Sequence, residues 1–278
     1  MDKNVLSRGI KNVRTPSFQK NSEIHTMAWV VEPGNWKEHD PFLLMAHDHM
    51  QSGVFGLHPH RGIETVTFLM EGTLNHYDSK HGKGVLYPGD AQWMTAGQGV
   101  EHIEDAAEGE TVSLLQLWVN LPAKSKMVPS RYQDLRRNDM VTIQEEGAEI
   151  RIFSGSYGNA AAETENVAPV TMLELNMEAG ATVSPRLPGS YNGFLYILEG
   201  EGEFGVNQKA GRKGQVLWMG AAGDAEESEI RIEAHSRMRI MLYAGEPIGE
   251  PVVARGPFVM NTEEEIVQAF DDYRNGKF

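Results

Sequence analysis

The sequence predicts an all-β protein made of two similar domains in tandem, with one helix at the C-terminal end. Three observations support this fold class. Short runs rich in β-branched and aromatic residues alternate with Gly, Pro and Asn along the chain. Two of these runs recur in the same order in the second half of the sequence. A clear helical pattern occurs only after residue 260.

The β-type runs are short and closely spaced. Turn signals such as Pro88-Gly89-Asp90 and Glu199-Gly200 separate them. Clear examples are residues 65–70, 114–119, 194–198 and 238–243. Many short strands joined by tight turns are typical of an antiparallel sandwich or barrel.

An internal repeat indicates that the two domains are related. Residues 68–72 match residues 196–200 at an offset of 128, and residues 89–94 match residues 214–219 at an offset of 125. The offsets differ by a small loop change and the order is kept. We therefore expect a first domain over residues 1–140 and a second domain over residues 141–278 that ends in the helix.

The tail of the chain predicts this helix. Thr262 and Glu265 have the spacing of a capping box, with Thr262 as N-cap. An apolar stripe follows at helical spacing, formed by Ile266, Phe270 and Tyr273. Gly276 is placed to end the helix. We expect the stripe to pack against a β-barrel wall.

Composition limits the classes of function. The formal charge of −14 repels phosphate backbones, so we expect no direct nucleic-acid binding. There is no Cys, which excludes disulfides and thiolate ligands and leaves His, Asp and Glu to hold any metal. No apolar run reaches the length of a membrane span, and the N-terminal residues lack a secretory pattern. We expect a cytoplasmic protein, or a nuclear one if the source is eukaryotic, with no membrane contact.

Two pairs of side chains form a candidate metal site. His58 and His60 are two residues apart, as are His102 and Glu104, and residues at this spacing on a strand share a face. If both strands face one interior, three imidazoles and a carboxylate converge. Such a set suits Fe(II), Mn, Ni, Cu or Zn, and it leaves two positions open on a six-coordinate ion. Spacing alone also allows a structural alternative, in which His58 and His60 cap a loop and His102 is a buried polar group.

The motifs around these residues resemble the pirin family. The segments that carry the resemblance are residues 58–66, 92–97, 117–121, 40–44 and 256–262. The resemblance extends from about residue 40 to the end of the chain and is strongest in the first domain. It implies a bicupin: two antiparallel jelly-roll β-barrels, with iron in the N-terminal barrel only. It also implies that His58, His60, His102 and Glu104 are the metal ligands.

Glu64 is a second candidate for the carboxylate ligand. Many other cupins carry a ligand in this region, and Glu64 has the same strand parity as His58 and His60. The pirin pattern favours Glu104, which leaves Glu64 a supporting role. In the second repeat the four ligand positions fall on Arg186, Pro188, Glu227 and Glu229, so we expect no ligand set there.

Several other residues are candidates for the surroundings of the site. His47 and His49 would lie at the mouth of a pocket or in a surface loop. His76 would lie near the cavity and His81 in a turn. Candidates for an apolar cavity wall are Phe42, Phe55, Trp93 and Met94, each of which would otherwise belong to the ordinary core.

The resemblance implies two classes of function. Several pirins act as quercetin 2,3-dioxygenases, which open the central ring of a flavonol with dioxygen and release carbon monoxide. In such an enzyme Glu104 would be the general base for the flavonol hydroxyl. Other pirins are regulatory proteins whose iron site controls binding to a protein partner. A bicupin that acts on another small molecule is a third reading, and the sequence does not separate the three.

Overall fold

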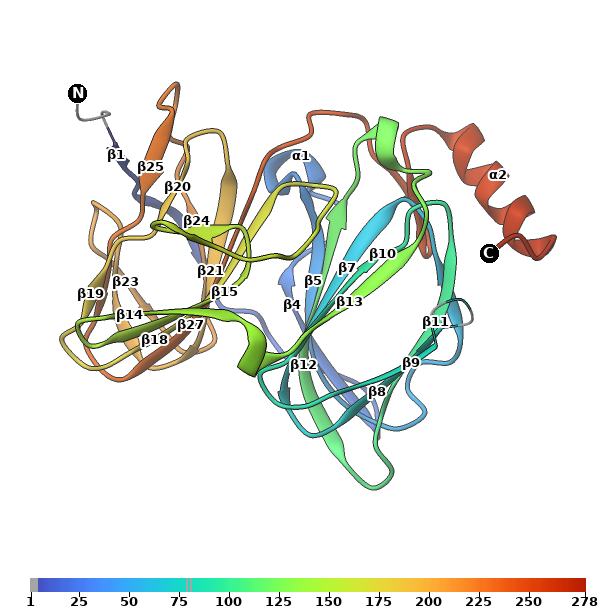
Figure 1. Ribbon diagram of the computed structural model, residues 1–278, viewed down its shortest axis with the longest axis horizontal. Helices are drawn as coiled ribbons and strands as arrows, with labels where there is room; N and C mark the ends of the chain where they lie inside the picture. Colours follow the sequence, from blue (N-terminus) through green and yellow to red (C-terminus); the bar gives the residue numbers. More distant parts are fainter. Residues whose placement is uncertain (1–4, 79, 81) are drawn as a thin grey trace. The chain divides into compact units, whose positions relative to one another are not determined.

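The structure, a computed structural model, describes residues 5–78, 80 and 82–278, and these residues form two compact units (Figure 1). The first unit contains residues 17–139, 166–168 and 248–278. The second unit contains residues 5–16, 140–165 and 169–247. Each unit is built almost entirely of β-strands, which confirms the predicted all-β class.

The first unit is a jelly-roll sandwich of two antiparallel sheets. Its seven-stranded sheet has the order β13 (Arg131–Leu135), β10 (Ala91–Thr95), β7 (Ile63–Glu71), β12 (Thr111–Asn120), β5 (Phe42–Gln51), β4 (His25–Val31), β3 (Gln19–Ser22). Its four-stranded sheet has the order β6 (His58–His60), β11 (Val100–Ala106), β8 (Leu74–Asp78), β9 (Gly82–Leu86). The hairpin of β28 (Val253–Arg255) and β29 (Phe258–Met260) also belongs here, with the short helices α1 (Trp36–His39), η1 (Ala123–Ser125) and η2 (Arg137–Asp139).

The second unit has the same architecture. Its seven-stranded sheet has the order β14 (Val141–Glu145), β15 (Ala148–Ser154), β18 (Val170–Met177), β27 (Met238–Gly245), β21 (Asn192–Glu199), β24 (Val216–Met219), β2 (Ile10–Arg14). A four-stranded sheet contains β19 (Thr182–Val183), β26 (Ile232–Ala234), β22 (Glu201–Phe204) and β23 (Lys209–Arg212). Smaller sheets are formed by β1 (Leu6–Ser7), β25 (Glu227–Glu229) and β20 (Arg186–Pro188), and by β16 (Ser156–Tyr157) and β17 (Ala160–Ala161).

The internal repeat corresponds to equivalent strands. The neighbours β10, β7, β12 and β5 in the first unit match β24, β21, β27 and β18 in the second. The turns after β7 and β21 are also alike, because Gly72 and Gly200 adopt φ values of 79° and 80°. A Cβ at Gly200 would lie 2.1 Å from the Arg237 carbonyl oxygen, so this turn requires glycine. Two related cupin-type domains are confirmed.

The compact units differ from two consecutive halves of the chain. The chain passes from one unit to the other between Asp139 and Met140, but the N-terminal segment belongs to the second unit. There β1 pairs with β25 and β2 pairs with β24. Arg8 is buried in the same unit and donates hydrogen bonds to the Ser228 hydroxyl and to the carbonyls of Pro188, Gly189 and Tyr191. Strand pairing between distant segments is the physical reason for this difference.

The C-terminal helix α2 (Glu263–Arg274) begins and ends as predicted. The Thr262 hydroxyl accepts a hydrogen bond from the Glu265 backbone, and the Glu265 carboxylate accepts one from the Thr262 backbone. Ile266 and Ala269 are buried in one cluster with Phe258 and Met260. The helix therefore packs on the first unit, although it follows the second domain in the sequence.

The hydrophobic cores lie between the sheets of each unit. In the second unit a large hydrophobic cluster includes Ile152, Leu175, Leu195 and Ile240. In the first unit the apolar residues form separate clusters, one around Leu69 and another around Ile63. Among the described residues, no helix has the length and apolar character needed to cross a membrane.

Candidate metal centre

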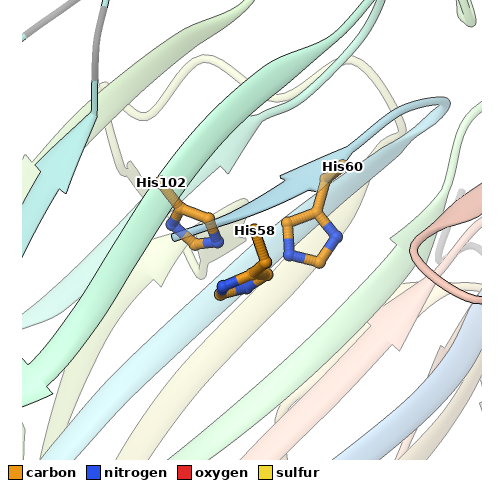
Figure 2. Close-up of side chains that lie close together, drawn as sticks. All are labelled: His58, His60 and His102. Carbon is orange, nitrogen blue, oxygen red and sulfur yellow. The ribbon is translucent and has the colours of Figure 1, made fainter. Parts of the chain in front are cut away.

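Three histidines converge in the first unit because of how strands β6 and β11 pair. In this antiparallel ladder His58 lies directly opposite His102, so their side chains share a face. His60 is two residues further along β6 and points to the same side. The ring centroids of His58 lie 4.9 Å from His60 and 4.5 Å from His102. Figure 2 shows the three imidazole rings gathered around one point, and one ligand nitrogen from each lies within 4.8 Å of the others.

The three rings are held in the neutral form that a metal requires. Burial lowers the pKa of His58, lowers that of His60 to about 3, and holds that of His102 well below its ordinary value. The Nδ1 atom of His58 donates a hydrogen bond of 2.8 Å to the Gly56 carbonyl, which leaves its Nε2 lone pair free. The His60 ring hydrogen-bonds the Pro257 carbonyl.

His102 supplies the strongest sign that the cluster suits a metal. Its side chain is buried, yet neither ring nitrogen has a hydrogen-bond partner among the described residues. Buried polar atoms of this kind are rare in folded proteins, because each one costs free energy. A metal ion bound to the three imidazoles would satisfy one of these nitrogens, so the donor set fits the group that the pirin resemblance implies.

Glu104 lies beside this cluster but outside the group of three. It follows His102 by two residues on β11, so both side chains share a face, and it lines the same cavity as His58 and His60. Its Oε1 atom accepts a hydrogen bond of 2.7 Å from the Thr67 hydroxyl. Burial raises the pKa of Glu104 to about 7, against the effect of this hydrogen bond. Its role as fourth ligand stays a prediction.

Glu64 lies on the opposite side of its sheet from the cavity. Glu64 would share a face with His58 and His60 only on one continuous strand, but the chain turns at Gly62, where φ is 79°. A Cβ at Gly62 would lie 2.0 Å from the Val259 carbonyl oxygen, so the turn depends on glycine. After this turn the odd-numbered side chains of β7, instead of the even-numbered ones, face the cavity. Thr67 therefore faces the cavity and Glu64 faces away from it. Glu64 instead accepts hydrogen bonds from the Thr95 hydroxyl and the Val167 backbone.

A cavity of about 480 Å³ opens beside the histidine cluster. Its walls come from β3, β4, β5 and β12, with further residues from β6 and β11, and half of the lining side chains are apolar. The lining residues are Gln19, Asn21, His25, Met27, Trp29, Leu44, Ala46, Asp48, Met50, Phe55, His58, His60, Glu104, Leu114, Gln116 and Trp118.

The predicted cavity wall is correct at one position of four. Phe55 lines the cavity, whereas Phe42, Trp93 and Met94 are buried and do not. The sequence analysis missed Trp29 and Trp118. A signal for Trp118 was present, since it alternates with Leu117 on a strand predicted from the sequence.

The histidine-rich segment of β5 contributes its aspartate to the cavity. Asp48 lines the cavity, while His47 and His49 point to the other face and pack against Phe18. Neither predicted position of His47 and His49 is found, because both residues lie on strand β5 and neither lines the cavity. The Asp48 Oδ1 atom lies 2.7 Å from Nε2 of His25, a contact the sequence did not predict.

The remaining histidines near the site have other positions. His76 is buried behind the cluster, with its ring centroid 5.4 Å from that of His102, and it does not line the cavity. His81 lies outside the described residues. In the second unit the positions equivalent to the ligands are on β20 and β25, where Arg186 forms an ion pair of 3.6 Å with Glu227.

Comparison with known families identifies the chain. The family model named Pirin matches residues 18–119, and the model named Pirin C-terminal cupin domain matches residues 172–278. The chain belongs to the pirin family. The histidine cluster lies in the part of the chain that the first of these models matches.

Individual relatives agree with this membership. Pirin-1 of Arabidopsis thaliana is 40% identical over 241 residues, which cover 86% of this pirin and 83% of the relative. The crystal structure of GK1651 from Geobacillus kaustophilus is 53% identical, with a TM-score of 0.88, and covers 89% of this chain and 100% of that one. A crystal structure named quercetin 2,3-dioxygenase from Acinetobacter baumannii is 28% identical, with a TM-score of 0.85 and 98% coverage of both chains.

Proposed function

We propose that this pirin is a mononuclear non-haem iron dioxygenase that opens a flavonol such as quercetin with dioxygen and releases carbon monoxide. The observation that carries the proposal is the position of the histidine cluster. Three neutral imidazoles form one cluster, and two of them, His58 and His60, line a cavity of about 480 Å³, which is within the size range of small-molecule sites. The similarity to the Acinetobacter baumannii quercetin 2,3-dioxygenase supports the substrate class.

We propose that His58, His60 and His102 hold the ion and that Glu104 is the fourth ligand. These nitrogen and oxygen donors suit Fe(II), although Mn, Ni, Cu and Zn accept the same set. When bound, the metal supplies a Lewis acid toward the flavonol oxygen atoms. The hydrogen bond from Thr67 to Glu104 orients the carboxylate on the cavity side.

The chain's own residues perform two further tasks in this proposal. The Glu104 carboxylate accepts the proton of the flavonol hydroxyl that becomes the reacting oxygen, as a general base. The apolar side chains of Trp29, Leu44 and Trp118 form walls that take a flat aromatic ring and exclude water.

The direct test is turnover of quercetin by the iron-loaded protein. Dioxygen uptake and carbon monoxide release are measured together, with His58→Ala as the matched control. We expect equimolar uptake and release by the wild type and none by the variant. Iron-loaded wild type that consumes no dioxygen with quercetin would reject the proposal.

A regulatory function is the second candidate, and one observation favours it. Arg61 follows the ligand position His60 and donates a hydrogen bond of 2.8 Å to Asp272 on α2. The iron site is therefore joined to a helix that has exposed side chains for a protein partner. If this function holds, the oxidation state of the iron changes the affinity for that partner, and an Asp272→Ala variant loses the dependence.

A further inference from the structure

The cavity contains a second polar group that the proposed reaction does not use. His25 on β4 and Asp48 on β5 form a hydrogen-bonded pair, with His25 Nε2 2.7 Å from Asp48 Oδ1. The Asn21 amide nitrogen lies 3.4 Å from the other ring nitrogen of His25. All three side chains line the cavity. Asn21 thus holds the His25 ring in place, and the His25 ring holds the Asp48 carboxylate in place.

Asp48 has spare capacity to accept hydrogen bonds. A carboxylate accepts about four, and His25 provides the one side-chain hydrogen bond that Asp48 has among the described residues. Asp48 is only 4% exposed, and the residues beside it on the same strand face are Ala46 and Met50. A carboxylate in an apolar wall costs free energy unless further donors reach it.

The pair is not needed to join its two strands. The backbones of β4 and β5 already pair over residues 25–31 and 45–50. A buried polar pair, even a charged one, also contributes little net stability compared with apolar side chains of the same size. A role in ligand binding explains the position of the pair better than a role in folding.

The pair and the histidine cluster border the same space. The ring of Phe55 lies between them, with its centroid 5.5 Å from that of His25 and 6.3 Å from that of His58. The negative charge of Asp48 also contributes to the raised pKa of Glu104. A planar ligand that touches the cluster at one end can therefore reach Asp48 with another part.

We infer that Asp48, positioned by His25, determines specificity by accepting a hydrogen bond from a second hydroxyl of a polyhydroxylated aromatic substrate. The inference deepens the proposed function and takes its substrate class from it. Hydroxyl groups donate to Asp48, whereas a carboxylate at this place would be repelled by Asp48 and Glu104 together. The substrate class is thus narrowed to neutral phenols with hydroxyls on both sides of the molecule.

Ligand binding tests the inference without turnover. Zinc-loaded protein is used because zinc has no redox chemistry, and quenching of the cavity residues Trp29 and Trp118 reports binding. The ligands are quercetin and 3-hydroxyflavone, which has only the hydroxyl of the reacting end. The variants are Asp48→Asn and, as a control on the other face of the same strand, His47→Asn.

We expect Asp48→Asn to weaken quercetin binding about 10- to 100-fold, the usual effect of losing a hydrogen bond to a charged group. Binding of 3-hydroxyflavone should change little, and His47→Asn should affect neither ligand. Equal weakening of both ligands by Asp48→Asn, or no weakening of either, overturns the inference. Wild type that binds neither flavonol rejects the substrate class as well, whereas binding without dioxygen uptake by the iron form rejects only the proposed reaction.

Discussion

His58 and His102 stand directly opposite each other on the antiparallel strands β6 and β11, with ring centroids 4.5 Å apart. The histidine cluster therefore depends on strand register as much as on residue identity. A slip of one residue between these strands would turn His102 to the other face and leave His58 without its neighbour.

Metal analysis should find one equivalent per chain in the wild type. Replacing His58, His60 or His102 with Ala should lower metal affinity by at least about 10- to 100-fold. Loss of a residue that only hydrogen-bonds to a metal ligand typically has an effect of this size, and loss of the ligand itself should have a larger one. Equilibrium competition with a chelator measures the affinity. Glu227→Gln with Glu229→Gln, at the equivalent positions of the second unit, is the control. Loss of metal from that double variant would contradict the assignment to the first unit.

Glu104→Gln should retain part of the metal and lose flavonol oxidation. The amide oxygen is a weak ligand, but an amide does not accept a proton at neutral pH. Metal content and dioxygen uptake are measured on the same preparation. Full activity in this variant would show that another group is the base.

Glu64→Gln should have the opposite effect to Glu104→Gln: it should lower stability and leave the metal content unchanged. Its carboxylate accepts hydrogen bonds from Thr95 and Val167, and an amide would place a donor against one of these donors. We expect the free energy of unfolding to fall by about 2 kcal/mol, with metal content unchanged. Urea unfolding with metal analysis checks both values. If Glu64→Gln lost the metal while remaining folded, Glu64 would replace Glu104 as the carboxylate ligand.

Lys126 should make stability depend on pH above neutrality. Its ammonium group donates hydrogen bonds of 2.9 Å to the Gly62 and Val259 carbonyls and to Asn120, and burial lowers its pKa from 10.5 to about 8. Between these two values the unfolded chain binds more protons, so this group makes the folded state more stable as pH rises.

The expected rise is up to about 3 kcal/mol between pH 8 and 10.5, taken as wild type minus Lys126→Met. Urea unfolding at a series of pH values measures this rise. The tyrosines also titrate in this range, but both proteins contain them, so their contribution to the free energy of unfolding cancels in the difference. The exposed Lys124→Met variant should show no such difference from the wild type. If the difference in free energy of unfolding between wild type and Lys126→Met did not change with pH, Lys126 would stay charged over the whole pH range.

Loss of the capping box should destabilise α2. Thr262→Ala removes the acceptor for the Glu265 backbone N–H, and such a change typically costs about 1 kcal/mol. Glu265→Ala should have a similar effect, because it removes the reciprocal bond. Glu264→Ala, in the same exposed turn but outside the box, should change stability by less than half as much. Thermal unfolding compares the three variants, and equal effects of all three would contradict the capping account.

The sequence by itself determined the features that rest on local geometry. The two-residue spacing of His58 and His60 places both on one strand face wherever that strand lies. The capping box at Thr262 needs only residues within one helical turn. The repeat of residues 68–72 at 196–200 showed two related units, because equivalent turns require the same glycines.

Only the tertiary structure decided which side chains share the cavity. The turn at Gly62 reverses the face of β7 and moves Glu64 away from the histidine cluster, and its shape is set by contact with Val259, far away in sequence. The His25–Asp48 pair exists because β4 and β5 are neighbours. Helix α2 joins the first unit because its apolar face meets Phe258 and its Asp272 meets Arg61. Alternation along a strand is readable from sequence, but which strands pair, and where a turn resets that alternation, depends on contacts between distant segments.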